Sequence, residues 1–575
     1  MKKMRLVSCV VLIISMLAIA ACSGDGEDKG SAGLPPAAEQ LPLLEMVPEN
    51  TQVLVKFEGL ENLYGQLAVS QNSVLGVSVE QKEIDRINAA LGFNLMDLEQ
   101  VRQAGFDTAQ PFCLAIPNLQ LDAADSRQTD FDVLALLPVS DGETAMNTLR
   151  AALEKENVLV AEAEKNGRSY LKWRYPEAEG AMAVKDQYLC MAVNSDNDPQ
   201  AFLDSLLENN ASLADSKTFR EVAADTDFTR GLAAYFNIAG MVEANAEQIR
   251  QAAASGSDSA AETQEMLQTL RQYSAGTMTA EFGSPDFTLD TIVSLVPDAD
   301  IKKVWSPDRI NRDKVLSIAD PAAFLLSFGV DMRQYYEMIT DMLPPEQYAT
   351  VASRMKEFER NSGIDPETEL LDNLSGSMNL ALYDGASITL MNYNALFTAG
   401  VNDAKVMKDV IEKFIKLLPP DKQSMISRRQ VGGTDAYVIN AGVTQVYMGI
   451  DDETFMISSG KPLYEKALDG KKDQGFAASL ADDRLKESIT GKRNIFYLNI
   501  DEVVKTVNNF AMFLMESAGG EQQFRQKLDA AGKFKYILAT SELENDLVKS
   551  MLTIQTRFTE PFFVETARMV DDLQQ

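Results

Sequence analysis

Histidine is absent from the 575 residues of this chain. Histidine is the commonest general base and a frequent metal ligand, so Ser-His-Asp catalysis, Cys-His catalysis and histidine-type zinc sites are excluded. The chain also lacks the G-x-S-x-G, Walker A, G-x-G-x-x-G and C-x-x-C-H motifs. We therefore expect no cofactor and no bound metal, and we expect the protein not to be an enzyme.

Long apolar runs are scarce as well. One run, from Leu6 to Ile19, is shorter than the roughly 20 residues that cross a bilayer as a helix. It follows three basic residues and precedes two alanines, which is the layout of a secretory signal peptide. We predict that residues 1–21 form such a signal.

The end of this signal has a more specific pattern. Ile19-Ala20-Ala21-Cys22 resembles the lipobox of bacterial lipoproteins, in which the cysteine is acylated and the peptide is cut before it. The resemblance implies a lipid anchor at Cys22, passage through the lipoprotein export machinery and residence in the cell envelope. Ser23 at the next position resembles the pattern for export to the outer membrane, facing the periplasm or the cell surface. The alternative is an ordinary cleaved signal followed by a chance cysteine.

Cysteine is rare, with four in the chain. Cys9 lies in the signal and Cys22 is the expected lipidation site, which leaves Cys113 and Cys190 inside strand-like runs. An exported chain meets oxidising conditions, so the two could form a disulfide. The equally weighted alternative is two separate buried thiols that pack as small apolar side chains.

Basic residues are outnumbered, and the formal net charge is -32. Removal of the three basic residues of the signal leaves -35 for the mature chain (-32 minus 3). Such a chain repels phosphate backbones, so we expect no nucleic-acid partner. It also disfavours broad contact with an anionic membrane surface, so attachment to the membrane depends on the lipid at Cys22.

The first part of the mature chain predicts a tether and then ordered structure. Residues 22–44 are rich in glycine, serine and charge, which favours a flexible linker. A strand follows at 53–57, where alternation predicts Val53, Val55 and Phe57 on one face and Lys56 and Glu58 on the other. Later strand runs are joined by short polar turns, which indicates antiparallel pairing.

The second half of the chain echoes the first at a lag of about 260 residues. Four pairs of segments match in the same order: 131–141 with 393–403, 167–206 with 433–468, 232–242 with 494–504, and 276–295 with 532–551. We predict an α+β fold with two homologous domains at 45–305 and 306–575. Each is expected to be a mainly antiparallel sheet covered by helices.

Several polar residues are candidate sites. Asn237 and Asn499 stand at equivalent strand-to-helix junctions, where asparagine is typical of a helix cap. Residues 194–198 partly follow a calcium loop, but lack its glycine and final glutamate, which favours a turn. Ser458 and Lys461 match S-x-x-K, in which lysine serves as the base for a serine nucleophile. A polar turn is the favoured interpretation there.

The start of the first repeat, Pro48-Glu49-Asn50-Thr51, resembles the strand start of a family of exported bacterial proteins of unassigned function. This resemblance implies a tandem-repeat fold and assigns no site residue. We expect a non-enzymatic binding or scaffold module whose partner is an envelope protein or a glycan. The alternative is a histidine-free hydrolase of cell-wall or polysaccharide material that acts through carboxylates or through Ser458 and Lys461.

Overall fold

The computed structural model does not describe every residue of the chain. It describes residues 42–66, 73–74, 77–78, 85, 88–89, 91–121, 129–156, 158–165, 167–175, 178–194, 199–208, 211–246, 269–281, 285–305, 310–383, 394–442, 444–470, 475–476, 480, 483–491, 493–515, 521–562, 564–566 and 568–569. The predicted signal peptide, the predicted lipidation site Cys22, most of the predicted tether and the loop at 195–198 lie outside these residues.

The chain divides into two compact units. Unit 1 comprises residues 1–297 together with 558–575, and unit 2 comprises residues 298–557. The division falls eight residues before the boundary predicted at 305/306 (305 minus 297), and the last 18 residues (558–575) group with unit 1 rather than with unit 2.

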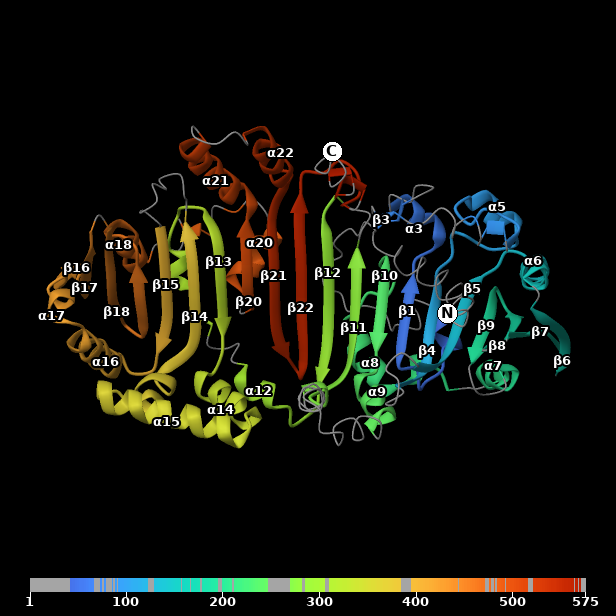
Figure 1. Ribbon diagram of the computed structural model, residues 1–575, viewed down its shortest axis with the longest axis horizontal. Coiled ribbons are helices and arrows are strands. Elements are labelled where there is room, and N and C mark those ends of the chain that lie inside the picture. Colours follow the sequence, from blue (N-terminus) through green and yellow to red (C-terminus); the bar gives the residue numbers. More distant parts are fainter. Residues whose placement is uncertain are drawn as a thin grey trace. The chain divides into compact units, whose positions relative to one another are not determined.

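Unit 1 contains a sheet of ten described strands (Figure 1). Their order across the sheet is β12-β11-β10-β1-β4-β5-β9-β8-β7-β6, and every neighbouring pair is antiparallel. The strands are β1 (Val53–Phe57), β4 (Phe112–Leu121), β5 (Thr129–Pro138), β6 (Leu159–Lys165), β7 (Arg168–Tyr175), β8 (Ala178–Lys185), β9 (Tyr188–Asn194), β10 (Leu232–Phe236), β11 (Tyr273–Glu281) and β12 (Phe287–Leu295). A separate small hairpin joins β2 (Ser73–Val74) and β3 (Val77–Ser78).

Unit 2 also contains ten described strands, in the order β22-β21-β20-β13-β14-β15-β19-β18-β17-β16. All neighbouring pairs are again antiparallel. The strands are β13 (Ala322–Gly329), β14 (Leu374–Tyr383), β15 (Asn394–Val401), β16 (Ile426–Val431), β17 (Thr434–Ala441), β18 (Thr444–Asp451), β19 (Thr454–Ser458), β20 (Asn494–Asn499), β21 (Phe534–Glu544) and β22 (Leu547–Thr556).

The two units therefore repeat one strand order. In unit 1, β1 lies between β4 and β10, and in unit 2, β13 lies between β14 and β20. In both units these are the first, second and eighth of the ten strands of the sheet in sequence order. The α+β fold with antiparallel sheets is confirmed. This shared order is what a duplication would produce, and the common origin of the halves stays a prediction.

Helices accompany both sheets. In unit 1 they are α3 (Leu60–Gln66), α5 (Leu98–Gln103), α6 (Gly142–Lys155), α7 (Pro199–Glu208), α8 (Lys217–Ala223) and α9 (Ile238–Ala244). In unit 2 they are α12 (Asp300–Val304), α13 (Asp313–Leu316), α14 (Met332–Met342), α15 (Pro345–Ser362), α16 (Ala404–Leu417), α17 (Pro420–Gln423), α18 (Lys461–Asp469), α20 (Asp483–Thr490), α21 (Ile500–Met515) and α22 (Glu521–Ala531). Short 3₁₀ turns η1 (Pro42–Met46) and η2 (Leu213–Asp215) and the π-helix η4 (Pro366–Leu371) complete the described elements.

The predicted helix caps are confirmed. The Asn237 side-chain oxygen accepts the N–H of Gly240 at 2.9 Å, and that of Asn499 accepts the N–H of Glu502 at 3.2 Å. Both satisfy N–H groups that the first helical turn leaves without an intrahelical partner, an arrangement that stabilises a helix by about 1 kcal/mol. Tyr235 and Tyr497, two residues before these asparagines, are buried at equivalent strand positions.

Lys56 lies on the other face of the first strand and is buried there. It is only 1% exposed, and its ammonium donates to the carbonyl oxygens of Thr229 (3.3 Å) and Arg230 (3.1 Å), just before β10. Strand alternation could not predict this burial, because the covering loop is distant in sequence. Burial lowers the pKa of Lys56 to about 8, although Glu58 and Asp227 act in the opposite direction.

Unit 2 also buries a cation at the equivalent place, but a different residue supplies it. Ser327 on β13 occupies the position of Lys56, since Leu54 pairs with Tyr235 and Leu325 with Tyr497. There the cation comes from Arg312, which is 4% exposed and donates to Ser327 at 3.0 Å. The Arg312 guanidinium also donates to the carbonyl oxygens of Gly491 and Arg493, just before β20. Each unit thus buries one cation against the carbonyls that precede equivalent strands.

Candidate functional site

The main core of unit 2 lies on one face of its sheet. Buried side chains from β13, β14, β15 and β20 pack there against α13, α18 and α20. On β13 this face takes Leu325 and Ser327, both fully buried. The alternation of a strand then sends Phe324, Leu326 and Phe328 to the opposite face. The β13 sequence Ala-Ala-Phe-Leu-Leu-Ser-Phe-Gly is therefore mostly apolar on both faces.

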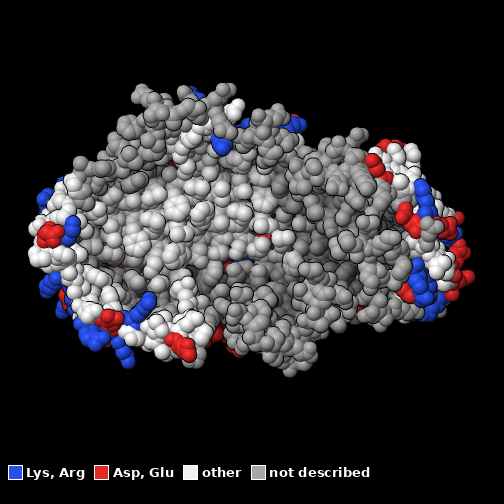
Figure 2. Space-filling view, in the orientation of Figure 1, with Lys and Arg blue, Asp and Glu red and all other residues white. Residues whose placement is uncertain are grey.

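The opposite face is apolar across six neighbouring strands. Cross-strand register places 14 residues there, which we call the open apolar face: Phe324, Leu326, Phe328, Met378, Leu380, Leu382, Ala395, Phe397, Phe496, Leu498, Ile537, Ala539, Leu552 and Ile554. All 14 are partly exposed, and Leu382 and Phe496 reach 37% and 38%. Figure 2 shows an uncharged surface over this region of unit 2, with charged side chains gathered at its left and lower margins.

The size of this face is comparable with that of the largest exposed apolar patch on a typical monomeric protein. Five strand spacings of about 4.8 Å give a width of about 24 Å, and three residues on one side of a strand extend about 13 Å. The footprint is on the order of 300 Å², the range in which an exposed apolar patch on a monomer is often functional. The face is therefore a candidate binding surface.

The equivalent face of unit 1 provides an internal comparison. There the chain covers its own sheet, because Leu60, Leu63 and Tyr64 of α3 pack on side chains of β1, β4 and β5. Phe57, at the position of Phe328, is 1% exposed, and Ala234, at the position of Phe496, is also 1% exposed. One strand order thus carries two different faces. In unit 1 the face is covered around Phe57, whereas Val53 and Val55 remain partly exposed, and in unit 2 all 14 residues of the face are partly exposed.

Part of the same sheet face in unit 2 is covered, at the β15–β19 end. A second core forms there from buried residues of α16, β15 and β17 together with Ile364, which follows α15. Side chains of α15, η4, β18 and β19 pack against it. The open apolar face is therefore bordered by a conventional core and lies on the strands beyond it.

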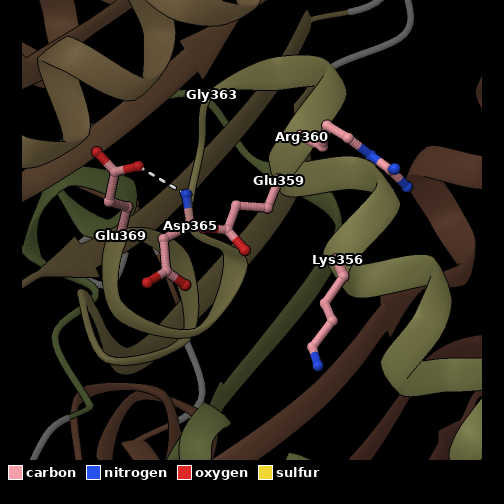
Figure 3. Close-up of a pocket in the computed structure, with 6 residues that line it drawn as sticks. All are labelled: Lys356, Glu359, Arg360, Gly363, Asp365 and Glu369. Carbon is pink, nitrogen blue, oxygen red and sulfur yellow. Dashed lines mark hydrogen bonds between the residues drawn. The ribbon is translucent and has the colours of Figure 1, made fainter.

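A polar hollow of about 360 Å³ lies between α15 and η4 (Figure 3). It is lined by Lys356, Glu359, Arg360, Gly363, Asp365 and Glu369. Its carboxylates have structural roles. Asp365 accepts the N–H groups of Glu367 and Thr368, and Glu369 accepts the N–H of Asp365 at 2.7 Å. The arrangement caps η4.

Charge in this hollow is also compensated. The Lys413 ammonium lies 2.6 Å from the Glu369 carboxylate and lowers the pKa of that group. A hydrogen bond from Thr368 lowers the pKa of Asp365. In Figure 3 the Arg360 side chain points away from both carboxylates. A general acid requires a raised carboxyl pKa, so these residues are poor candidates for acid–base catalysis.

The structure gives Ser458 and Lys461 separate partners. The Ser458 hydroxyl is fully buried and donates to the Gly460 carbonyl oxygen at 3.0 Å, while the Gly460 N–H donates back at 3.4 Å. The Lys461 ammonium is exposed and pairs with Glu465 at 3.2 Å, one helical turn along α18. This is the polar turn favoured by the sequence, and the geometry offers no support for a serine nucleophile.

Cys113 and Cys190 are free and buried, which corrects the disulfide alternative. They lie on β4 and β9, the two neighbours of β5, and both stand opposite Leu136. Two strand spacings separate the backbones by about 9.6 Å. A disulfide requires Cα atoms within about 7 Å. Strand-like sequence alone could not show that a third strand lies between them.

Two further observations concern possible membrane spans and metal sites among the described residues. Within the described part of the chain, no helix is long and apolar enough to cross a membrane. No group of three or more acidic or cysteine side chains in that part could hold a metal ion. The open apolar face could not be predicted from the sequence, because each of its strands resembles an ordinary core strand. The sequence has apolar residues on both sides of β13, β14 and β20, and this pattern does not indicate which side is covered.

The fold and the site define a protein of two antiparallel α+β units, one with an open apolar sheet face. The chain belongs to the family described as "Protein of unknown function (DUF3352)", whose model matches residues 110–533. The matched range runs from just before β4 to just before β21 and so includes parts of both units. The description assigns no chemistry to the family.

No curated protein matches this chain. Among solved structures, crystal forms III, I and IV of TP0453 are similar at 10% sequence identity, with TM-scores of 0.25, 0.23 and 0.23. The alignments cover 46%, 46% and 44% of this chain and 82%, 80% and 81% of those chains. TM-scores of this size carry no argument about fold or function.

Proposed function

We propose that this protein is a lipid-anchored resident of the bacterial cell envelope and acts as a non-enzymatic binding module. Its binding surface is the open apolar face of unit 2. The anchor rests on the lipobox resemblance at Cys22 and the export pattern at Ser23, which favours the outer membrane. The binding role rests on one observation: 14 apolar residues share one sheet face and remain partly exposed.

The chemistry of the face selects among the expected partners. Apolar surface leaves water favourably, at roughly 25 cal/mol per Å². A glycan presents hydroxyl groups that need hydrogen-bond partners, and burying them without partners is unfavourable. An apolar molecule or an apolar protein surface is therefore favoured over the glycan partner expected from sequence.

Site-specific photocrosslinking in intact cells tests this proposal. A benzophenone amino acid replaces Phe496 on the face or, as the control, Tyr348, which is 50% exposed on α15 of unit 2. Both positions are exposed, so both variants are expected to fold. We expect a reproducible adduct, to protein or lipid, from position 496 and none from position 348. Equal or absent labelling at the two positions would show that the face is not a binding surface.

A further inference from the structure

We infer that copies of this protein join through edge strands of their sheets, with β6 of one copy paired antiparallel to β16 of the next. This surface is separate from the open apolar face, and the inference goes beyond the proposed function. It is carried by the backbone groups that the two strands direct outward, by the opposite charges of the strands and by one register that satisfies both.

Both strands lie at an edge of the sheet of their unit. Among the described strands, β6 pairs with β7 alone and β16 with β17 alone. Two residues separate Lys165 from its partner Arg168, and two separate Val431 from its partner Thr434. The pair that closes such a hairpin is hydrogen-bonded, and hydrogen-bonded pairs alternate along antiparallel strands. The residues whose backbone N–H and C=O groups point away from the sheet are therefore Val160, Glu162 and Glu164 on β6 and Ile426, Arg428 and Gln430 on β16.

The side chains at both edges are accessible. Leu159, the first residue of β6, is 74% exposed, the largest fraction among the exposed large apolar side chains of the described residues. The side chain of Glu162 remains 69% exposed although it pairs with Arg150. That of Arg428 remains 47% exposed although it pairs with Asp435. Another strand can therefore approach either edge and reach these charges.

The two edges carry opposite charges. β6 has Glu162 and Glu164 at outward positions, with Lys165 at its hairpin end, whereas β16 has Arg428 and Arg429 and no acidic residue. Charged side chains on an edge strand ordinarily prevent pairing with another chain. Pairing β6 with β6, or β16 with β16, would bring like charges together, which is destabilising. Pairing β6 with β16 brings glutamate to arginine, so the charges exclude the first two combinations and favour this one.

One register satisfies the backbone and the side chains together. Outward residues must oppose outward residues, so the register can shift only in steps of two. With Glu162 opposite Arg428, β6 pairs with all six residues of β16. A shift of two residues in either direction leaves part of β16 beyond the end of β6. The same register places the exposed Leu159 opposite Val431, which belongs to the main core of unit 2.

The neighbouring helices extend this complementarity. Arg150 of α6 lies 2.5 Å from Glu162, and Glu412 of α16 lies 3.7 Å from Arg428. Residues that oppose each other in an antiparallel pair project to the same side of the sheet. The row across the junction is therefore Arg150, Glu162, Arg428 and Glu412, which alternate in sign. No like charges become neighbours in this row.

This contact joins unit 1 of one copy to unit 2 of another, so it is heterologous. Each copy in a joined pair keeps one edge free, and the assembly continues into chains or closes into rings. We therefore expect species larger than a dimer as the protein concentration rises.

Sedimentation velocity of the purified full-length protein in detergent tests the inference. One variant is Glu162→Lys with Glu164→Lys, and the other is Arg428→Glu with Arg429→Glu. The control is Glu346→Lys with Glu357→Lys, at exposed positions of α15. We expect wild type and control to associate, and each edge variant to associate at least about tenfold more weakly. An equimolar mixture of the two edge variants should associate again, because the new lysines meet the new glutamates, which also shows that both variants are folded.

A disulfide trap tests the register. Ala161 and Arg429 form a close pair in it, with Cα atoms about 4.5 Å apart, within disulfide range. Ala161→Cys with Arg429→Cys should therefore give a ladder of crosslinked copies on a non-reducing gel. Ala163→Cys with Arg429→Cys, offset by two residues, is the control and should crosslink less.

Four outcomes would overturn the inference. They are a monomer at every concentration, association that both edge variants retain, a mixture of edge variants that stays dissociated, and a ladder that is stronger for the offset pair. Association lost instead in Leu382→Gln with Phe496→Gln would assign self-association to the open apolar face. That result would also overturn the pairing of edge strands, and it would leave the proposed binding role of the face intact.

Discussion

The ring of Phe496 on β20 meets the ring of Phe324 on β13 edge to face, with centroids 5.6 Å apart and an angle of 83° between the planes. Aromatic pairs of this geometry usually lie in buried cores. Here Phe496 keeps 38% of its surface exposed, because the pair belongs to the open apolar face. A well-formed aromatic contact thus stands where a ligand can reach it.

The exposure of Phe496 predicts a small effect of Phe496→Ala on stability. We expect a loss of about 1 kcal/mol, the worth of one aromatic contact. By contrast, Phe57→Ala should lower the free energy of unfolding by about 3 to 5 kcal/mol, since Phe57 is 1% exposed and stacks on Phe112. Urea unfolding is followed by tryptophan fluorescence, with Trp173 reporting on unit 1 and Trp305 on unit 2. Equal losses would mean that the face of unit 2 is covered.

Arg312 predicts a second stability difference. Arg312→Met leaves the carbonyl oxygens of Gly491 and Arg493 without this donor. Unsatisfied buried groups each destabilise by about 1 to 3 kcal/mol, so with two such carbonyl groups unit 2 should lose about 2 to 6 kcal/mol. The control is Arg333→Met on α14, where the guanidinium pairs with Glu337 and Glu367 near the surface and contributes about 1 kcal/mol or less. A loss no larger than that of the control contradicts the structural role of Arg312.

Lys56 predicts a pH dependence of unit 1. Its pKa is about 8 in the folded protein, against an ordinary value of 10.5. Between these values the unfolded chain keeps a proton that the folded chain has lost, so the free energy of unfolding rises with pH. Below pH 8 both states are protonated, and the full penalty of burying the charge is present. The rise from this one group amounts to about 3 kcal/mol when complete.

The variant Lys56→Met isolates this contribution. Other groups titrate in the same range, so the informative quantity is the difference between wild type and variant, measured by urea unfolding with Trp173 as the reporter. We expect that difference to change steadily between pH 8 and 10.5 and to be flat from pH 6 to 7.5. Parallel stability curves over the whole range would show that Lys56 is not buried with a lowered pKa.

The contrast between Lys56 and Asn237 shows what the sequence could predict. The cap at Asn237 depends on a residue three positions along the chain, so it could be read directly from the sequence. The burial of Lys56 depends on carbonyls about 170 residues away, and alternation along β1 says nothing about them. The strands and the helix caps depend on residues that are close together in the chain, and the shared order of segments appears as a repeat. These features could therefore be predicted from the sequence.

The open apolar face, like the burial of Lys56, depends on contacts between residues that are distant in sequence. Phe496, Leu382 and Phe397 share one sheet face only through the register of β20, β13, β14 and β15. In unit 1 the same strands are covered by α3, which follows β1 directly. In unit 2 the helices that follow β13 are α14 and α15, and the second of these packs in the core at the β15–β19 end instead. The packing of the helices that follow the first strand of each unit therefore decides which part of the sheet face stays exposed.

The two cysteines give the last prediction. Cys113 and Cys190 are buried, and burial raises the pKa of both thiols, that of Cys190 to about 12. The thiolate is the reactive form, so both should resist alkylation by iodoacetamide at pH 8 in the folded protein and react once urea unfolds unit 1. Mass spectrometry without reductant should then find both cysteines alkylated. Cys113→Ala and Cys190→Ala should each lower the stability of unit 1 by about 1 kcal/mol, as expected for loss of a small packed group. A non-reduced peptide pair joining the two residues would instead require β4 and β9 to be closer than β5 allows.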